Sequence, residues 1–357
     1  MASDQDLVVE TVRDILAAHE PFVLTPERPW DGGLWSALAE AGLTGVGLPE
    51  EAGGSGGEPA DAVAVVRTLA AGAAAVPVAE QLLVAGPALV AAGLDLPPVD
   101  EPMTVAFADG VTAHASDDGD GPGRFLLTGV AEDVPWVEIA SHLALVVPAP
   151  AGLDGALLAL TGISAATISP SVNLAGEPRG SIALSEAPAT GALLTAAAAD
   201  ELRARYALAR AVQIAAALEQ VLTWTVQYAG ERQQFGRPLG KFQAIQMELA
   251  QMAGEVTAVT ALTDAAVQAL ERGGDVPAAA AAAKVRAGAA VEVVARLAHQ
   301  VHGAIGFTQE YRLHHLTRRC WSWRDEAGSE LTWARVLGNA LLAGGADGLW
   351  PALTKLI

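Results

Sequence analysis

Hydrophobic residues recur every three or four positions along much of the second half of the chain, a spacing that places them on one face of an α-helix. The clearest run consists of Ile245, Leu249, Met252, Val256, Val259, Leu262, Ala266 and Leu270. Gly273 and Gly274 follow this run as a stop signal, and Asp275 is placed to cap the next helix. From residue 191 to residue 357 the pattern predicts four or five long helices packed as a bundle.

The first 96 residues also show helical spacing, interrupted by glycine-rich breaks. Leu34, Leu38 and Leu43 recur at helical intervals, and the segment GLPEEAGGSGG at residues 47–57 breaks the pattern. The glycine run in that segment lacks the Gly-Lys-Ser/Thr ending and the preceding strand of a phosphate-binding loop. We therefore predict a helical N-terminal domain in which this run is a connector.

Residues 97–190 have a different texture, with short β-prone segments separated by clusters of Asp, Gly and Pro. These segments are residues 103–107, 125–127, 143–147 and 166–169. A small β domain fits this pattern. The predicted fold class is α+β, mainly α, with domains at residues 1–96, 97–190 and 191–357.

The charge balance argues against two classes of partner. The chain has 21 Lys and Arg residues against 41 Asp and Glu residues, a formal net charge of -20 at pH 7. Such a surplus of negative charge repels phosphate backbones and anionic lipid surfaces. We expect neither nucleic acid nor a membrane as a partner.

The hydrophobic content does not indicate a membrane protein. Much of the 52% hydrophobic composition is alanine, which favours helices and adds little transfer free energy. The longest uncharged stretch, residues 155–176, is interrupted by Thr, Ser, Pro and Asn, so no spanning helix is predicted. The N-terminal segment MASDQDLVVE carries acids where a secretory signal has basic residues, and a cytoplasmic location is the expectation. Cys320 is the single cysteine, which excludes an intrachain disulfide and favours a packing role.

Two segments carry functional signals. The first, YAGERQQFGRPLGKFQAIQ at residues 228–246, joins two predicted helices and sets a guanidinium beside an aromatic ring at a tight turn. This pairing suits a diphosphate and the edge of a ring system, although the residues alone favour a solvated corner between helices. The second, HQVHGAIGFTQEY at residues 299–311, combines glycines that permit close backbone approach with the amide of Gln300. We expect a helix to end at Gly303 and to restart near Gln309.

The first segment closely resembles the signature YAxxRxQFGxPLxxFQAIQ of the acyl-CoA dehydrogenase family. The second is similar to the family's QxxGGxGxxxEY, with Ala304 where the family often has glycine. A third and weaker match, residues 34–54, resembles the family's N-terminal pattern, which runs from LW to LPExxGG. The resemblance covers nearly the whole chain and implies an N-terminal helical domain, a middle small β-barrel domain and a C-terminal four-helix bundle.

The resemblance also implies FAD as the cofactor and an acyl-CoA as the substrate. In this family FAD lies at a subunit interface, where the two signatures reach a cofactor held mainly by the neighbouring subunit. The matching positions are Arg232, Gln234, Phe235, Phe242, Ile245, Gln300, Val301, Gly303 and Ala304. Such enzymes remove an α-proton with a carboxylate while the flavin accepts the β-hydride, and an electron-transferring flavoprotein is the usual acceptor.

The sequence departs from the family at the catalytic base. Matching Gly328-Ser329 with the family's E-G-T segment places Ala327 at the usual glutamate position, and the alternative position of some relatives falls near Tyr206. Glu326 and Glu330 are the nearby candidates for a displaced base. A one-residue step along a helix turns a side chain by about 100°, so Glu326 should not point where Ala327 does. The sequence leaves the base unknown.

The middle domain departs from the family as well. The family's T-E-P-x-x-G-S stretch is not recognisable between Met103 and Ala131, and an acidic loop at residues 116–120 is a poor neighbour for anionic phosphates. Trp136 fits either a ring-flanking strand or an ordinary core position. This half of a cofactor site therefore looks degraded.

These departures are typical of the shorter subunit of heteromeric acyl-CoA dehydrogenases of actinobacterial type, which also share the segment at residues 318–330. In such enzymes a longer paralogue supplies the glutamate, giving a heterotetramer that acts on bulky thioesters such as steroid side chains. Two alternatives stay open: a homo-oligomer with a displaced base, and a degenerate CoA-binding or structural member without redox activity. On physics alone, Trp321, Trp323 and Trp333 are packing or interface residues.

Two charged clusters suggest other chemistry. The adjacent His314 and His315 point about 100° apart on a helix and cannot both face one ion without distortion, so no metal is predicted. Asp325 and Glu326 resemble a carboxylate pair, but a solvated face or an ion pair with Arg324 or Arg318 is commoner.

Overall fold

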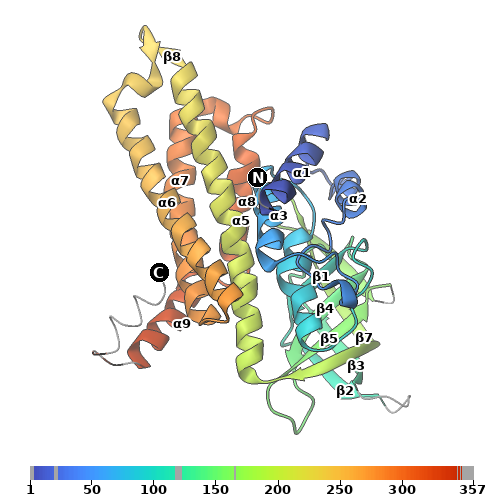
Figure 1. Ribbon diagram of the computed structural model, residues 1–357. Coiled ribbons are helices and arrows are strands. Elements are labelled where there is room, and N and C mark those ends of the chain that lie inside the picture. Colours follow the sequence, from blue (N-terminus) through green and yellow to red (C-terminus); the bar gives the residue numbers. More distant parts are fainter. Residues whose placement is uncertain are drawn as a thin grey trace. The chain divides into compact units, whose positions relative to one another are not determined.

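The computed structural model describes residues 4–19, 23–116, 123–164, 166–343, 345 and 347. The chain divides into two compact units, the first made of residues 1–65 and 74–206 and the second of residues 66–73 and 207–357 (Figure 1). No helix among the described residues is long and apolar enough to span a bilayer. The predicted boundaries of three domains, at residues 96/97 and 190/191, stay a prediction.

Helices precede the sheet in sequence. They are α1 (Asp4–Ala18), α2 (Gly32–Glu40), η1 (Glu50–Ala52), α3 (Pro59–Ala71), η2 (Glu80–Ala85) and α4 (Gly86–Ala91). The Asp31 side chain caps α2 by accepting a 3.0 Å hydrogen bond from the Leu34 amide. A Cβ at Gly54 would lie 2.2 Å from the Leu48 carbonyl oxygen, so this tight turn requires glycine.

A buried glutamine ties these helices to the sheet. The Gln81 side chain donates to the carbonyl oxygens of Thr44 and Val99, at 2.8 Å each, and accepts from the Met103 amide at 2.9 Å. Gln81 lies in η2, a short π-helical turn, and Met103 opens the first strand. Each buried backbone group that it meets gains a partner that water cannot supply there.

The sheet of the first unit has seven strands. They are β1 (Met103–Phe107), β2 (Val111–Ala115), β3 (Arg124–Ala131), β4 (His142–Pro148), β5 (Ala156–Gly162), β6 (Thr167–Val172) and β7 (Pro178–Leu194). The order is β1-β4-β5-β7-β3-β2, with β6 also paired to β7. The β1–β4 pair is parallel and the other pairs are antiparallel.

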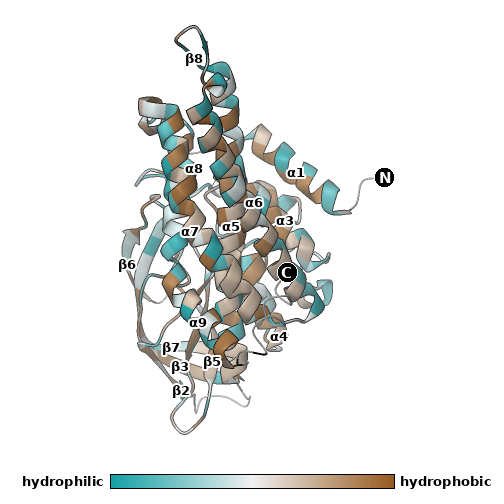
Figure 2. Ribbon diagram, turned by 90° about the vertical axis from the view of Figure 1, so that its left-hand side faces the viewer, coloured by the Kyte–Doolittle hydropathy of each residue, from teal (hydrophilic) through white to brown (hydrophobic). Residues whose placement is uncertain are grey.

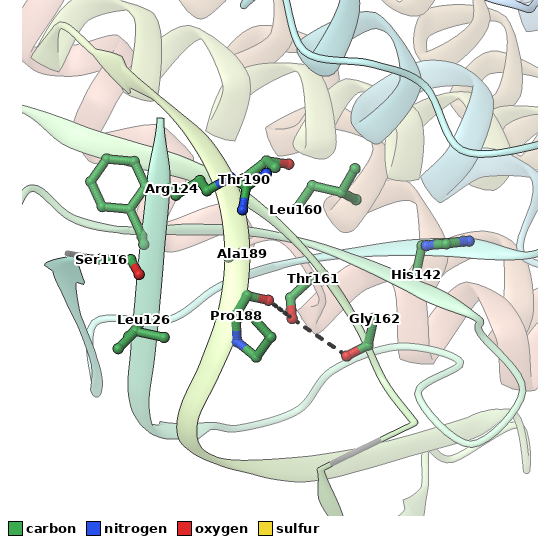
Figure 3. Close-up of a pocket in the computed structure, with 11 residues that line it drawn as sticks. Ser116, Arg124, Leu126, His142, Leu160, Thr161, Gly162, Pro188, Ala189 and Thr190 are labelled. Atoms are coloured by element: carbon green, nitrogen blue, oxygen red, sulfur yellow. Dashed lines mark hydrogen bonds between the residues drawn. The ribbon is translucent and has the colours of Figure 1, made fainter. Parts of the chain in front are cut away.

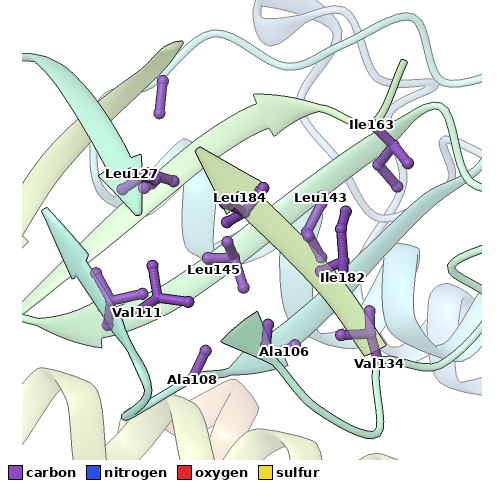
Figure 4. Packing of buried hydrophobic residues seen from close by; sticks show 14 of the residues in the cluster. Ala106, Ala108, Val111, Leu127, Val134, Leu143, Leu145, Ile163, Ile182 and Leu184 are labelled. Carbon is purple, nitrogen blue, oxygen red and sulfur yellow. The ribbon is translucent and has the colours of Figure 1, made fainter. Parts of the chain in front are cut away.

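The sheet curves around one hydrophobic core. Val111 of β2, Leu145 of β4 and Ile182 of β7 are fully buried in a single cluster, although β2 and β4 are far apart in the strand order (Figure 4). Burying each such side chain stabilises the fold by about 1.5–3 kcal/mol. The β structure expected between the two helical regions is therefore confirmed as a small curved sheet with one interior.

The four β-prone segments all fall in strands, but three strands were not predicted. Residues 103–107 coincide with β1, while the other three segments lie within β3, β4 and β6 or overlap them. The strand β7 is rich in Ala, Gly and Ser, which carry little β preference, while β2 (VTAHA) and β5 (ALLALTG) are short and each contain two alanines. Tertiary packing, rather than local propensity, makes them strands.

The second unit is helical, with a small hairpin. Its elements are α5 (Ala196–Glu231), β8 (Gln233–Gln234), β9 (Arg237–Pro238), η3 (Leu239–Lys241), α6 (Gln243–Arg272), α7 (Val276–His302), η4 (Gly303–Phe307), α8 (Leu313–Asp325) and α9 (Glu330–Ala343). The first residues of α5, up to Tyr206, belong to the first unit. The expected long helices are present, and Figure 2 shows hydrophobic and hydrophilic residues alternating along them.

The predicted break between α6 and α7 is confirmed, and one predicted restart is wrong. Gly273 ends α6 in the left-handed conformation, with φ 66°, and the Asp275 side chain accepts a 3.1 Å bond from Ala278 N. The helix after Gly303 restarts at Leu313 instead of near Gln309. The reason is that residues 303–307 form the 3₁₀ turn η4, which delays the next α-helix.

Candidate functional site

The segment at residues 228–246 forms a hairpin corner between α5 and α6. Gln233 pairs with Pro238, and Gln234 pairs with Arg237. Phe235 makes the turn in the left-handed region, with φ 51°. A residue with a Cβ pays roughly 1–2 kcal/mol for that conformation, so the turn holds Phe235 at the tip against its local preference.

The tip of this corner is aromatic, basic and exposed. The Phe235 side chain is 91% exposed, and its ring meets the Phe242 ring edge-on at 6.2 Å. The Arg237 guanidinium lies over the Phe242 ring at 4.2 Å. Arg232 and Lys241 add positive charge here, although the chain as a whole is strongly acidic. An aromatic ring left in water between cations suits contact with an aromatic, anionic molecule or another chain.

The segment at residues 299–311 lies at the end of α7. Gln300 and Ala304 are exposed, and Gly303 turns the chain with φ 64°. Val301 is only 5% exposed, so its side chain packs inside the unit. Only its backbone could contact a ligand. The spacing of Val294, Leu297 and Val301 at helical intervals is the sequence signal that predicts this burial.

The structure brings the two segments together through stacked rings. The Tyr228 and His302 rings stack at 4.4 Å, and the Tyr228 hydroxyl donates to the His302 carbonyl oxygen at 3.4 Å. Tyr311 meets the same imidazole at 5.2 Å. We call residues 228–246 and 299–311 together the signature end of the second unit.

The signature end suits FAD by the chemistry of its donors. Six of the predicted cofactor residues are exposed to solvent: Arg232, Gln234, Phe235, Gln300, Gly303 and Ala304. Phe242 and Ile245 are half-buried at the start of α6. A guanidinium, two amides and exposed rings match a diphosphate joined to aromatic ring systems. They face outward from this chain, so they suit a cofactor that a second chain also holds.

The segment that carries the family's base follows α8. Ala327 has φ 56° and Gly328 has φ 89°, so both adopt the left-handed region. The Trp333 indole nitrogen donates to the Ala327 carbonyl oxygen at 2.7 Å. A Cβ at Gly328 would lie 2.8 Å from that same indole nitrogen, which explains the glycine. We call residues 326–329 the α8–α9 loop.

Glu326 is held by a buried arginine. The Arg210 guanidinium, 1% exposed on α5, pairs with the Glu326 carboxylate at 2.9 Å and donates to the Gln213 side chain at 2.7 Å. The sequence named Arg324 and Arg318 as possible partners of the Asp325-Glu326 cluster, and the structure adds Arg210 as a partner of Glu326. The physical reason is that Arg210 is buried and needs a counter-ion. A lone arginine inside the apolar run of residues 207–218 was the available sequence signal.

Glu330 is also committed to an ion pair. Arg324 Nε donates to both carboxylate oxygens of Glu330, at 3.0 and 3.1 Å. The hydrogen bond from Arg324 lowers the pKa of Glu330 below its ordinary value. A carboxylate with a lowered pKa and a bidentate partner accepts a substrate proton poorly.

Lys284 completes this internal charge cluster. It is fully buried on α7 and donates to the carbonyl oxygens of Trp323, at 3.1 Å, and Arg324, at 2.6 Å. Burial, and then the nearby Arg210, lowers the pKa of Lys284 to about 7. We call these charged residues the loop cluster, because they hold the α8–α9 loop in place. Its members are Arg210, Lys284, Arg324, Glu326 and Glu330.

The other residues in question have structural surroundings. Tyr206, near the alternative base position, is buried and stacks on Phe107 at 6.1 Å. Trp136 is buried with φ 58°, and Arg179 lies 5.7 Å from its ring. Cys320 is buried, and burial raises its pKa to about 12, as expected of a packing residue. Of the two positions predicted for Trp136, beside the flavin or in the core, the structure shows the core position.

Two further features lie outside the predicted cofactor positions. His314 and His315 have ring centroids 4.1 Å apart, and within the described ranges no three His, Cys, Asp or Glu side chains gather as metal ligands. A cavity of about 490 Å³ opens in the first unit where β5 leaves β7, beside Arg124 and His142 (Figure 3). There the Thr161 hydroxyl donates to the Pro188 carbonyl oxygen at 2.9 Å. None of the predicted site residues lines this cavity.

Family models match the chain on both sides of the sheet. Residues 2–95 match the N-terminal domain of acyl-CoA dehydrogenases, and residues 195–341 match their C-terminal domain. The chain belongs to the acyl-CoA dehydrogenase family. Members bind FAD and are oxidoreductases that act on the CH–CH bond of an acyl-CoA. The resemblance, the fold class and the cofactor stated from the sequence are confirmed.

Among similar proteins are two acyl-CoA dehydrogenases of Mycobacterium tuberculosis. IpdE2 is 31% identical over 323 residues, covering 87% of this chain and 89% of that protein. FadE27 is 30% identical over 340 residues, covering 88% and 89%. A solved variant of the Tcur3481-Tcur3483 steroid ACAD has a TM-score of 0.84 at 28% identity, covering 96% of this chain and 99% of that chain. The ChsE4-ChsE5 complex from Mycobacterium tuberculosis shares the fold, with a TM-score of 0.83 at 24% identity, covering 96% and 98%.

Proposed function

We propose that this chain is the base-lacking subunit of a heteromeric FAD-dependent acyl-CoA dehydrogenase. It contributes cofactor-binding residues across the interface, and a longer paralogue supplies the glutamate that removes the α-proton. Glu326 and Glu330 serve structure in this proposal and not catalysis. Bound FAD supplies the acceptor for the β-hydride.

One contrast within the second unit carries the proposal. At the signature end, six of the nine predicted cofactor positions are exposed, Arg232 and Phe235 among them. The α8–α9 loop has Ala327 at the base position, and the two adjacent glutamates are paired with arginines. A chain built this way can hold a cofactor for another subunit but has no unpaired carboxylate in this loop for proton removal.

Each exposed residue has a defined task in this arrangement. The Arg232 guanidinium neutralises the diphosphate, because a bidentate cation suits paired phosphate oxygens. Gln234 and Gln300 offer donors and acceptors to polar edges, and Gly303 and Ala304 allow the adenosine end to approach the backbone. Phe235 excludes water from the phosphate, which strengthens its pairing with Arg232.

The partner and the substrate follow from the relatives. The Tcur3481-Tcur3483 protein, at 28% identity, is described as a steroid ACAD with two named components. By likeness, we assign this chain a heterotetramer with its paralogue, a bulky acyl-CoA such as a steroid side-chain thioester, and an electron-transferring flavoprotein as acceptor. A cytoplasmic location belongs to the same proposal.

The direct test measures flavin by absorbance near 450 nm. The chain is purified alone and together with a longer acyl-CoA dehydrogenase paralogue that has an intact catalytic glutamate. We expect a colourless chain alone, and a yellow complex that oxidises an acyl-CoA. Arg232→Ala in the same complex should lose flavin, whereas the control Arg296→Ala, on an exposed part of α7, should keep it. Full flavin content with turnover by the chain alone would overturn the proposal.

A further inference from the structure

His302 belongs to the second signature segment, residues 299–311, and its ring contacts the first segment, residues 228–246. It is the last residue of α7 and directly precedes Gly303, whose backbone belongs to the cofactor-facing turn. Its ring stacks on Tyr228, one helical turn before Arg232 on α5. The Arg232 amide donates to the Tyr228 carbonyl oxygen at 2.8 Å. A short chain of contacts therefore runs from Gly303 through His302 and Tyr228 to Arg232.

The hydrogen bonds of His302 fix its protonation. The Nδ1 atom lies 2.8 Å from the Ala298 carbonyl oxygen, which can only accept, so Nδ1 carries the proton. Nε2 is buried and has no hydrogen-bond partner among the described residues. The neutral ring thus needs nothing at Nε2, whereas a second proton there would be a buried donor without an acceptor.

The charged and titratable neighbours also oppose a second proton. Burial lowers the pKa of His302 below its ordinary value, the hydrogen bond to Ala298 raises it by less, and Arg312, between η4 and α8, lowers it further. Tyr228 from α5 and Tyr311 before α8 cover the ring with neutral phenols. On its own helix, His299 has a pKa lowered by burial and then by His302 and His314. The acid that acts in this group, Glu231, raises the pKa of Tyr311.

We propose that His302 is a positioning residue that couples the two cofactor-binding segments only as the neutral imidazole, so that mild acid uncouples them and releases the cofactor. The proposal rests on the proposed function for the identity of the cofactor. The coupling itself is a property of this chain alone. Protonation forces the ring away from the tyrosines toward water, and the Gly303 turn then loses its fixed distance from Arg232.

The first test uses the full chain without cofactor. Hydrogen exchange of residues 228–246 and 299–311 is compared at pH 7.5 and pH 5.5, after correction for the intrinsic effect of pH on exchange. We expect faster exchange in both segments at pH 5.5, by up to about tenfold for each pH unit below the ordinary histidine pKa. His302→Gln should remove this pH dependence, because glutamine does not titrate. His114→Gln, exposed on β2, should leave it unchanged.

A second pair of variants keeps the test informative if His302→Gln unfolds. Tyr228→Phe preserves the stacked ring and should behave as the natural chain does. Tyr228→Leu removes the ring and should give fast exchange of both segments already at pH 7.5. Equal exchange in the Phe and Leu variants, or a pH dependence that survives in His302→Gln, would overturn the proposal.

The closing experiment follows flavin in the complex with the paralogue. The complex is passed through gel filtration between pH 8 and pH 5.5, and the flavin that stays bound is measured. We expect several-fold loss of flavin at pH 5.5 in the natural complex and a flat profile in the His302→Gln complex. A natural complex that is colourless at pH 8 would refute the proposed function alone. Flavin that stays bound throughout the pH range would refute the role of His302.

Discussion

The two ends of α8 show opposite designs. At the signature end, before Leu313, the functional residues are exposed and rest on stacked neutral rings. After Asp325, the α8–α9 loop is held by charged side chains, and the two glutamates beside Ala327 are paired with arginines. The 13 residues of α8 separate the two regions by about 20 Å at a rise of 1.5 Å per residue. Exposure marks the region that meets a ligand or partner, and internal ion pairing marks the region that has become structural.

The largest effect should come from breaking the loop cluster. Arg210→Met leaves Glu326 half-buried without its main counter-ion, and we expect about 3–5 kcal/mol lower stability by urea unfolding. The double variant Arg210→Met with Glu326→Leu should recover much of this loss, since it removes both charges. A loss below about 1 kcal/mol in the single variant would show that the cluster does not fix the loop.

A substitution at the other end should spare stability and affect the cofactor. Arg232→Ala removes a charge-assisted hydrogen bond worth about 1.5–3 kcal/mol, so FAD affinity of the complex should fall by roughly tenfold to a hundredfold. Calorimetric FAD binding measures this change. The melting temperature of the chain alone should stay the same, because Arg232 is exposed. A lower melting temperature with unchanged FAD affinity would show that Arg232 serves stability and not cofactor binding.

The pH dependence of stability should report Lys284. Its pKa is lowered to about 7 in the folded chain by burial, against about 10.4 in an unfolded chain. Between these values the unfolded state holds more protons, so stability should rise with pH by up to about 1.4 kcal/mol per unit. Urea unfolding from pH 7 to pH 9.5 should show this rise in the natural chain and lose it in Lys284→Met. A parallel pH profile in both chains would contradict the assignment.

The smallest effect should come from Glu330. Glu330→Gln breaks a partly exposed ion pair with Arg324, so we expect a stability loss of about 0–1 kcal/mol. The kcat of the complex should stay within about twofold of the natural value, because the proposed function gives Glu330 no part in proton removal. A drop of a hundredfold or more in kcat, with FAD still bound, would identify Glu330 as a displaced base.

Much of the fold could be predicted from the sequence, because local patterns record it. The helical spacing after Ile245, the stop at Gly273 and the cap at Asp275 all appear in the structure. The strand β7 could not be predicted in this way, since its Ala and Gly residues become a strand only by pairing with β3, β5 and β6.

The candidate site divides in the same manner. Family resemblance predicts Arg232 and Gln300 as cofactor residues, and the structure shows both to be exposed. The loop cluster joins Arg210, Lys284 and Glu326, which are far apart in sequence, so no local pattern reveals that they meet. The ring contacts of His302 with Tyr228 and Tyr311 were missed for the same reason.

The most direct test of the central claim is flavin reduction by an acyl-CoA under anaerobic conditions, followed as bleaching near 450 nm. The chain alone is supplied with excess FAD and compared with the co-expressed complex. The expected result is bleaching by the complex and none by the chain alone. Bleaching by the chain alone, at a rate similar to that of the complex, would show that this chain carries its own base.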